Sequence, residues 1–313
     1  MTDAPAVTVL AGGVGAARFL QGLVQVCPPE DITAVVNTAD DVVLHGLHVS
    51  PDVDTVVYTL AGAIDRERGW GLAGETWQAM DALERYGGVT WFRLGDRDLG
   101  THLYRAHRLA QGAGLAEVTG EIARAWGLDL TVLPVTEDRL ETRVTVVDEG
   151  EIGFQEYFVQ RRHDIPVEGV RFAGAEAARP AAGVLPAVAG AGVVVIAPSN
   201  PLVSIGPLLA VPGVREAVID RRDHTVAVSP IVGGRALKGP ADRMLDELGH
   251  ESSAVGVARL YAPLAAALVI DEIDRDLAPA VEAEGVRAVV TDTVMRDPQT
   301  AAELARATVG AVR

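Results

Sequence analysis

Val7–Arg18 reads VTVLAGGVGAAR, and this stretch decides the fold. Its first residues are apolar and rich in β-branched side chains, as is typical of a strand buried on both faces. Gly12, Gly13 and Gly15 follow, and the next stretch, Arg18–Val26, has the amphipathic pattern of a helix. Glycine permits a tight turn and lets backbone N–H groups approach an anion, and a helix N-terminus adds positive partial charge. The order strand, glycine turn, helix therefore predicts the start of a Rossmann-like fold with a phosphate-binding loop.

The glycine motif matches neither standard phosphate-binding signature in full. Arg18 stands where the dinucleotide-binding pattern has its last glycine, and the motif is not a Walker loop. A tight turn without a ligand is therefore the alternative interpretation. Because strand, turn and helix agree in position, we favour phosphate binding, with Arg18 either adding charge or facing solvent.

Short apolar runs of the same kind recur along the chain and alternate with amphipathic stretches. This alternation is typical of a mostly parallel sheet with helices on both faces. Further strands are expected at Ile32–Val36, Val193–Ala197, Thr225–Ser229, Ala267–Ile270 and Ala288–Thr291. Further helices are expected at Thr76–Tyr86, Thr101–Gln111 and Ala241–Leu248.

The middle of the chain breaks this alternation. Residues from Gly74 to Arg124 have a mainly helical pattern, whereas Glu141–Val147 and Phe154–Gln160 alternate like two strands joined by a turn. We therefore predict an α/β fold with a Rossmann-like core formed by residues 1–73 and 180–313. Residues 74–179 are expected to form a mixed α+β insertion over the ligand edge of the sheet.

Composition narrows the class of protein. The 313 residues are 49% hydrophobic and 22% charged, which is ordinary for a folded globular chain. A net charge of −16 argues against general binding to nucleic acid or to anionic membranes. A single cysteine, Cys27, excludes an intrachain disulfide, and with no signal-peptide pattern we expect a cytoplasmic protein. Prolines interrupt the uncharged stretch between Arg179 and Arg215, so a buried strand and a loop are expected there, not a membrane helix.

Acidic residues gather after the second predicted strand. Asp40 and Asp41 follow it directly, and Asp52 and Asp54 come shortly afterwards. Open α/β sheets bind ligands at the carboxyl ends of their strands, and Mg²⁺ prefers carboxylate and phosphate oxygens. Such acids also cap helices or face water, and Asp54 has N-cap chemistry before the apolar stretch Val56–Leu60. The two nearby histidines lack the spacing of a zinc site.

Polar residues also follow the later strands. Ser199, Asn200 and Ser204 come after one buried strand, and Lys238 and Gly239 stand ahead of a helix. Small polar side chains at several strand ends can converge on one crevice. Lys238 is there a reasonable partner for a phosphate.

Two other patterns contain aromatic residues. Trp91–Asp98 packs two aromatics and two arginines, Arg93 and Arg97, around a glycine turn, and its acids also fit a surface salt-bridge cluster. Phe154–Phe158 alternates as a strand should, and its aromatic side chains suit a flat ring, although core packing is their commoner role.

Taken together and in order, these motifs resemble the 2-phospho-L-lactate transferase family of deazaflavin coenzyme F420 biosynthesis, and its bacterial members above all. The resemblance runs from Val7 to Met295, and no single motif is specific, but the set is. The motifs are GGVGAARFL, VVNTADD, SPDVDTVVYTLAG, GDRDLGTHL, FQEYFV, APSNPLVSIGP, SPIVGGRALKGPAD and TDTVM.

The resemblance implies a reaction and its substrates. A guanosine diphosphate carrying lactate or enolpyruvate would donate its phospho-acid to the terminal ribityl hydroxyl of the deazaflavin Fo, with release of GMP. Mg²⁺ is the implied cofactor, and a homodimer is usual for the family. Chemistry of this kind needs positioning and charge neutralisation more than a covalent nucleophile.

The resemblance also implies roles for individual residues. Asp40 and Asp41 would be the catalytic acids, with Asp40 the metal ligand. Asp54, Arg93 and Arg97 would contact the deazaflavin or the transferred phosphate. The remaining residues would surround the donor: Gly12, Gly13 and Gly15 at its phosphates, Ser199, Asn200 and Ser204 at the nucleotide, and Lys238 and Gly239 nearby.

Two rival functions remain at this stage. A related branch of the fold binds nucleotide sugars and regulates carbon flow and cell-wall synthesis without established catalysis, but the GDRD and FQEYF motifs favour the transferase branch. An NAD-dependent dehydrogenase fits less well, because the glycine fingerprint is incomplete and the acid expected about 20 residues downstream is missing. The sequence does not decide between lactate, enolpyruvate and glycerate in the donor.

Overall fold

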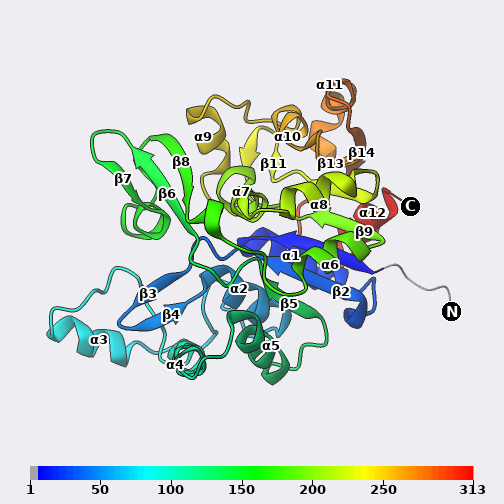
Figure 1. The fold of residues 1–313 in the computed structure, drawn as a ribbon. Helices are drawn as coiled ribbons and strands as arrows, with labels where there is room; N and C mark the ends of the chain where they lie inside the picture. Colours follow the sequence, from blue (N-terminus) through cyan, green and yellow to red (C-terminus); the bar gives the residue numbers. More distant parts are fainter. Residues whose placement is uncertain (1–5, 313) are drawn as a thin grey trace.

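A seven-stranded parallel sheet forms the centre of the computed structural model, which describes residues 6–312 (Figure 1). Its strands are β1 (Val7–Ala11), β2 (Ile32–Val36), β5 (Thr131–Pro134), β9 (Val193–Ile196), β10 (Thr225–Val228), β13 (Ala267–Asp271) and β14 (Arg287–Thr291). They lie in the order β14-β13-β10-β9-β1-β2-β5. The predicted α/β fold is confirmed, and the six strands expected outside the insertion are all present within one residue of their expected bounds.

The order of strands reverses at β1. The chain passes from β1 to β2 on one side and returns much later to β9 on the other, so Val9 pairs with both Ala34 and Val195. In open α/β sheets such a reversal leaves a crevice at the carboxyl ends of the strands, where ligands bind. The glycine motif stands at this point, directly after β1.

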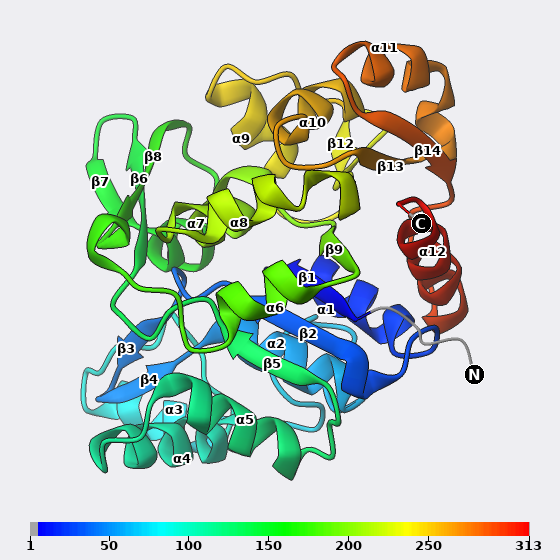
Figure 2. The ribbon, with the colours of Figure 1, turned by 45° about the vertical axis from the view of Figure 1, so that its right-hand side comes forward.

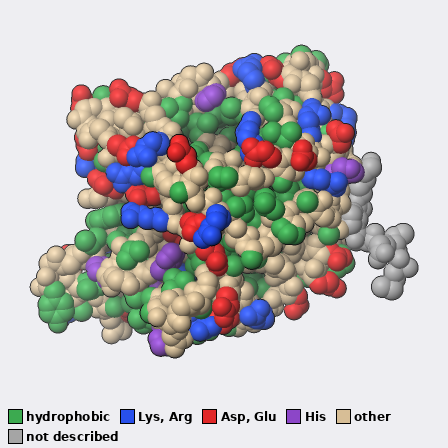
Figure 3. Space-filling view, in the orientation of Figure 1, with side chains coloured by type: hydrophobic (Ala, Val, Ile, Leu, Met, Phe, Trp, Pro, Cys, Tyr) green, Lys and Arg blue, Asp and Glu red, His purple; other side chains and the backbone are tan. Residues whose placement is uncertain are grey.

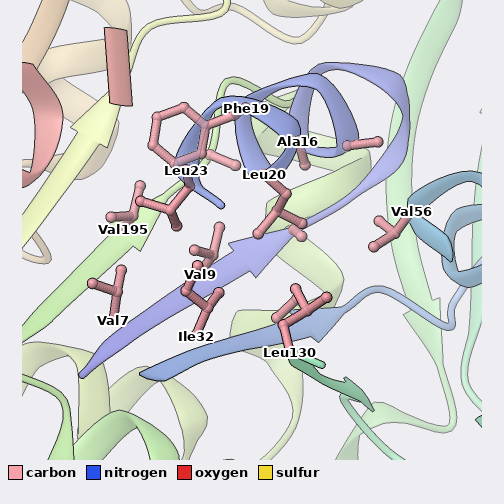
Figure 4. Packing of buried hydrophobic residues seen from close by; sticks show 14 of the residues in the cluster. Val7, Val9, Ala16, Phe19, Leu20, Leu23, Ile32, Val56, Leu130 and Val195 are labelled. Atoms are coloured by element: carbon pink, nitrogen blue, oxygen red, sulfur yellow. The ribbon is translucent and has the colours of Figure 1, made fainter. Parts of the chain in front are cut away.

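Helices cover both faces of the sheet. One face carries α1 (Gly13–Leu23), α2 (Pro51–Leu60), α5 (Leu115–Ala125) and α12 (Pro298–Gly310). The other carries α6 (Val184–Gly190), α7 (Gly206–Ala210), α8 (Val214–Asp220), α9 (Ala241–Glu247), α10 (Ala254–Tyr261) and α11 (Ala278–Ala283). Figure 4 shows Leu20 and Leu23 of α1 pointing toward the strands that carry Val9 and Ile32, with Phe19 above Leu23, and all five side chains are fully buried. Apolar burial on both faces explains why the strands lack the alternation of a half-exposed sheet.

Further elements lie beside the carboxyl edge of the sheet (Figures 1 and 2). They are the hairpin β3 (Val42–Leu44) and β4 (Leu47–Val49), the helices α3 (Gln78–Arg85) and α4 (Asp98–Ala110), and the small sheet of β6 (Glu141–Val146), β7 (Gly150–Gly153) and β8 (Val167–Ala173). A short hairpin, β11 (Ile231–Val232) and β12 (Arg235–Ala236), precedes α9. Strand β5 pairs with β2 although it lies within 74–179, so part of the predicted insertion belongs to the central sheet.

Two expected elements differ from the structure. Helix α1 begins at Gly13, inside the glycine motif, and not at Arg18. The partner of β6 is β7, and Phe154–Gln160 is helical, ending in the π-helical turn η2 (Glu156–Gln160). Phe154 and Phe158 stack with 5.5 Å between ring centroids. Their spacing of four residues places them on one helix face, and this contact between side chains prevailed over the strand-like alternation.

The surface carries both charges, and Figure 3 shows acidic and basic side chains interspersed on the face that it draws. No single helix among residues 6–312 is long and apolar enough to cross a membrane; one bent pair, Pro201–Ala210 with Val214–Asp220, passes by length and composition only. Most of that pair's apolar side chains, such as Leu208 and Val218, lie in the core.

The contact between α1 and α12 is close enough to predict a stability change. A Cβ added at Gly22 would lie 2.2 Å from the backbone carbonyl of Ala301. We therefore expect Gly22→Ala to lower the free energy of unfolding by about 1–3 kcal/mol, because α12 must shift. Gly100→Ala in α4 is the matched control, since its Cβ meets nothing within 4 Å, and it should stabilise by up to about 1 kcal/mol. Urea unfolding measures both, and an unchanged Gly22→Ala protein would contradict this packing.

Candidate active site

A cavity of about 800 Å³ opens at the carboxyl edge of the sheet, beside the reversal point. Its size and position are those of a small-molecule site. Eleven of the residues expected to bind substrate or metal line it: Gly12, Gly13, Gly15, Asp40, Asp54, Arg93, Ser199, Asn200, Ser204, Lys238 and Gly239. Asp41 and Arg97 do not line it. The fold thus brings together residues that are up to 227 positions apart (Gly239 against Gly12).

The glycine loop lies against the segment that follows β9. A Cβ on Gly15 would stand 2.0 Å from the carbonyl oxygen of Pro198, so only glycine fits there. Ser199 Oγ donates a 2.7 Å hydrogen bond to the carbonyl of Gly12. Gly13 has φ +70°, a conformation that glycine adopts without strain. Asp52 accepts a hydrogen bond from the backbone of Gly13 at the start of α1. The N-cap residue, Gly12, has no side chain to cap the helix, so the N–H groups that follow Gly13 remain available at the cavity.

Asn200 and its neighbours complete this side of the cavity. Asn200 Oδ1 accepts the N–H groups of Leu202 and Val203, which caps the turn η4 (Pro201–Ile205). Ser204 packs against Gly12, where an added Cβ would lie 2.7 Å away. These side chains therefore set the shape of the loop as well as lining the cavity.

Two carboxylates meet at the centre of the cavity. Asn37 Nδ2 donates to Asp40 Oδ2 at 3.1 Å and to Asp52 Oδ2 at 3.0 Å. Burial raises the pKa of Asp40 well above its usual range, with repulsion from Asp52 and Asp41 adding to the effect. Burial also raises the pKa of Asp52 to about 7. Asp52 was noted in the sequence only as a loop acid, and nothing in its local pattern distinguishes it from its neighbours.

Asp41 points elsewhere, although it is adjacent to Asp40 in the chain. Its Oδ2 accepts hydrogen bonds from His48 Nε2 and Ser50 Oγ, both at 2.8 Å. These contacts tie the β3–β4 hairpin to the start of α2. The structure therefore places Asp41 behind the cavity wall, where it contacts the hairpin.

Asp54 lies in the first turn of α2 and is not its N-cap, because the helix begins at Pro51. It is 5% exposed and forms a two-point ion pair with Arg105, which is fully buried. Sequence reasoning did not single out Arg105. The sequence did contain one pattern that could have identified it: Asp98, His102 and Arg105 are spaced by four and three residues, which places them on one face of a helix.

Arg93 and Arg97 differ in position. Arg93 lines the cavity with its guanidinium 4.6 Å from the ring centroid of Trp77, and no carboxylate among the described residues pairs with it. Arg97 is exposed, and its guanidinium donates to the carbonyl of Ala73. The expected salt-bridge cluster around it is not observed, because Asp96 accepts the N–H groups of Gln78 and Ala79 at the start of α3.

Lys238 and Gly239 line the cavity, and Gly239 lies beside Phe158. Burial and the nearby charge of Arg18 lower the pKa of Lys238. Arg18 and Lys238 both line the cavity, and neither has a carboxylate partner within residues 6–312. Two like charges that face each other without a counter-ion favour an anionic ligand.

A magnesium ion fits the carboxylate pair chemically. Asp40 Oδ1 is buried without a hydrogen-bond partner, and the repulsion between Asp40 and Asp52 would be relieved by a cation. The described residues contain no group of three or more histidine, cysteine or acidic side chains arranged to hold a metal. Mg²⁺ commonly takes only one or two carboxylates and completes its shell with water and substrate phosphate.

Comparison with known proteins identifies the family. Residues 7–309 match the family model described as 2-phospho-L-lactate transferase CofD. The chain belongs to this family. It is 46% identical over 305 residues to a phosphoenolpyruvate transferase of Streptomyces griseus, with 96% of each chain covered. It is also 46% identical over 305 residues to that of Streptomyces coelicolor, and 42% identical over 323 residues to that of Mycobacterium bovis.

Solved structures support the fold alone. Two crystal structures of the UPF0052 family protein BH3568 of Bacillus halodurans have TM-scores of 0.61 and 0.63 at 18% identity. They cover 96% and 97% of this chain. The CofD family assignment, by contrast, supports a transferase of coenzyme F420 biosynthesis.

Gly13→Val tests whether the glycine loop binds phosphate. At φ +70° a β-branched residue is strained by about 1–3 kcal/mol, which would displace the loop. We expect the affinity for GDP to fall about tenfold or more in calorimetry. Gly62→Val is the matched control, since Gly62 has φ +67°, nothing nearby, and no place in the cavity. If Gly13→Val and wild type bind GDP with equal affinity, the loop is a tight turn that does not bind the phosphates.

Asp52→Asn tests the electrostatics of the carboxylate pair. Because the pKa of Asp52 is raised to about 7 in the folded state, the folded protein holds a proton that the unfolded chain has lost between pH 4 and 7. Its contribution to stability therefore falls as the pH rises through this window. In EDTA, the free energy of unfolding of the variant, relative to that of wild type, should increase by roughly 1–4 kcal/mol from pH 5 to pH 8. Urea unfolding at both pH values measures this, and parallel pH profiles would contradict it.

Proposed function

We propose that this protein transfers a phospho-acid from a guanosine-diphosphate-activated donor to the deazaflavin Fo, releasing GMP, in coenzyme F420 biosynthesis. The acid would be enolpyruvate or lactate, and enolpyruvate is favoured by the names of the related proteins. Such a reaction belongs to the transferases of class EC 2.7.8. The observation that carries the proposal is one cavity whose lining combines the start of α1, cations without carboxylate partners and two crowded carboxylates.

The proposed reaction forms one phosphodiester bond and breaks another phosphorus–oxygen bond. The terminal hydroxyl oxygen of Fo attacks the phosphorus that carries the acid, the bond to the bridging oxygen breaks, and GMP leaves with that oxygen. The hydroxyl proton passes to solvent. Because the transition state of such transfers is loose, catalysis depends on alignment and on charge neutralisation.

Each part of the cavity has a role in this proposal. The backbone N–H groups after Gly13 and the side chains of Arg18 and Lys238 would bind the donor's phosphates. Asp40 and Asp52 would hold Mg²⁺, which neutralises the charge of the diphosphate when bound. Arg93, seated on Trp77, would contact the acceptor ring or the transferred group.

Mass spectrometry of the product tests the function directly. Fo and Mg²⁺ would be incubated with guanosine diphosphate derivatives of enolpyruvate, lactate and glycerate in turn. A phosphodiester-linked deazaflavin with stoichiometric GMP supports the proposal and identifies the acid. Binding of nucleotide sugars without turnover would support the regulatory alternative, and tight NAD binding without response to Fo would favour the dehydrogenase.

Asp40→Asn tests the proposed metal ligand. It removes a charge at nearly constant volume, so the fold and Fo binding should persist. Loss of metal-based stabilisation costs several kcal/mol, and about 1.4 kcal/mol is tenfold in rate, so we expect turnover to fall about a hundredfold or more. Excess Mg²⁺ should recover part of it if weakened ion binding is the cause.

Asp41→Asn is the matched control, since Asp41 contacts the hairpin and not the cavity. It should lower the melting temperature more than the turnover number. Steady-state rates and thermal melting on the same samples separate the two effects. An Asp40→Asn protein that melts early and turns over normally would remove Asp40 from the active site.

The acceptor and the dimer rest on the family resemblance, and the cytoplasmic location rests on the single cysteine and the missing signal-peptide pattern. We retain all three as parts of the proposal. Fluorescent deazaflavin that co-purifies with the protein would support the acceptor, and sedimentation would test the homodimer.

A further inference from the structure

Asn37 stands directly after β2 and is fully buried. Its backbone N–H donates a 2.9 Å hydrogen bond to the carbonyl of Ala11, which continues the pairing of β2 with β1. Its side-chain Oδ1 accepts the backbone N–H of Ala39 at 2.9 Å. Because a backbone N–H can only donate, this contact fixes which end of the amide is the oxygen. The sheet and Ala39 therefore determine where the Nδ2 atom of Asn37 lies.

That Nδ2 atom has two hydrogens and meets two carboxylates. It donates to Asp40 in the same loop at 3.1 Å, and to Asp52 in the first turn of α2 at 3.0 Å. Asp52 in turn accepts the backbone N–H of Gly13, and Thr142 faces Asp40. One amide thus connects the loop after β2 with the start of α2 and, through Asp52, with the glycine loop.

Another buried carboxylate of this protein has a different partner. Asp54 forms a two-point ion pair with Arg105, so its charge is compensated. Asp40 and Asp52 repel each other, and no ion pair among residues 6–312 includes either of them. A neutral amide spaces these two acids and leaves their charge uncompensated, whereas a lysine or arginine in its place would compensate it. The pair therefore retains its attraction for a cation.

We propose that Asn37 is a positioning residue for the carboxylate pair, whose Nδ2 atom holds Asp40 and Asp52 together for one divalent cation. The inference rests on the function proposed above, in which these two acids hold Mg²⁺, and it adds the residue that keeps them in place. Asn37 does not line the cavity, so it acts through the two acids and not on the substrates.

Removal of the amide has a definite consequence. Without its two donors the carboxylates move apart under their own repulsion, and a cation that needs both of them in one coordination shell binds more weakly. Mg²⁺ shares its shell with substrate phosphate, so the loss appears as weaker metal-dependent binding of a diphosphate. Binding without metal depends on cations and backbone N–H groups and should change little.

Calorimetry with GDP on the intact protein, in Mg²⁺ and in EDTA, tests this role without turnover. Wild type should bind GDP about tenfold or more tightly in Mg²⁺ than in EDTA. In Asn37→Ala that ratio should fall to about threefold or less, while the affinity in EDTA stays within about twofold of wild type. Asn37→Ser keeps a single donor, so its ratio should lie between the two. It carries the test if Asn37→Ala does not fold.

Thr8→Val is the matched control for the loss of a buried hydrogen bond. Thr8 is buried in β1, donates to the carbonyl of Ala187 at 2.8 Å and does not line the cavity. Its substitution by valine removes that hydrogen bond at nearly constant shape. The melting temperature should therefore fall while the ratio of GDP affinities stays at the wild-type value.

Three results would count against the inference. If the Asn37 variants keep the wild-type ratio, Asn37 does not position the pair, and the proposed metal ligands stand. If they lose GDP affinity equally in Mg²⁺ and in EDTA, the substitution distorts the whole site, and the positioning role is again wrong. A wild-type ratio near one would refute the metal pair itself, and this inference with it, whereas the product analysis would still decide the transfer reaction.

Discussion

The architecture depends on the close approach of two backbone segments at the reversal of the sheet. Gly15 lies against the carbonyl of Pro198, and Ser199 is hydrogen-bonded to the carbonyl of Gly12. No side chain larger than glycine permits this contact. It closes the gap between the turns after β1 and β9 and aims the start of α1 at the cavity. The surrounding hairpins and helices supply the walls around this junction (Figure 2).

The cavity separates charge in space, and each region has its own cause. Burial raises the pKa values of Asp40 and Asp52, and the charge of Asp52 raises that of Asp40 further, which makes the pair a site for a cation. Between α2 and α4, Arg105 forms a two-point ion pair with Asp54, and hydrogen bonds from His102 and Tyr58 lower the pKa of Asp98 although burial opposes this. The same residue type thus serves two purposes because its neighbours differ. Arg18 and Lys238, which also line the cavity and lie near each other, attract anions.

This division suits a transfer between two substrates that differ in charge. A diphosphate donor requires cations and backbone N–H groups, whereas uncharged hydroxyl groups also bind carboxylates. Holding both substrates in one cavity would align their reacting groups. Such alignment is the main contribution that a protein makes to phosphoryl transfer.

The amino-acid sequence determined the strands, the glycine turn and the family, because apolar runs and motif order are local properties that a reader can follow along the chain. It also identified eleven of the residues that line the cavity, since loops after parallel strands meet at one edge of the sheet. Only the tertiary structure decided that Asp40 faces the cavity while Asp41 holds a hairpin, because neighbours in the chain point in different directions. The roles of Asp52, His102 and Arg105 likewise depend on partners that lie 12 to 51 positions away (Asp40 for Asp52, Asp54 for Arg105), and the helix at Phe154–Gln160 depends on aromatic stacking. Burial and charge pairing are properties of the folded arrangement, and no local pattern contains them.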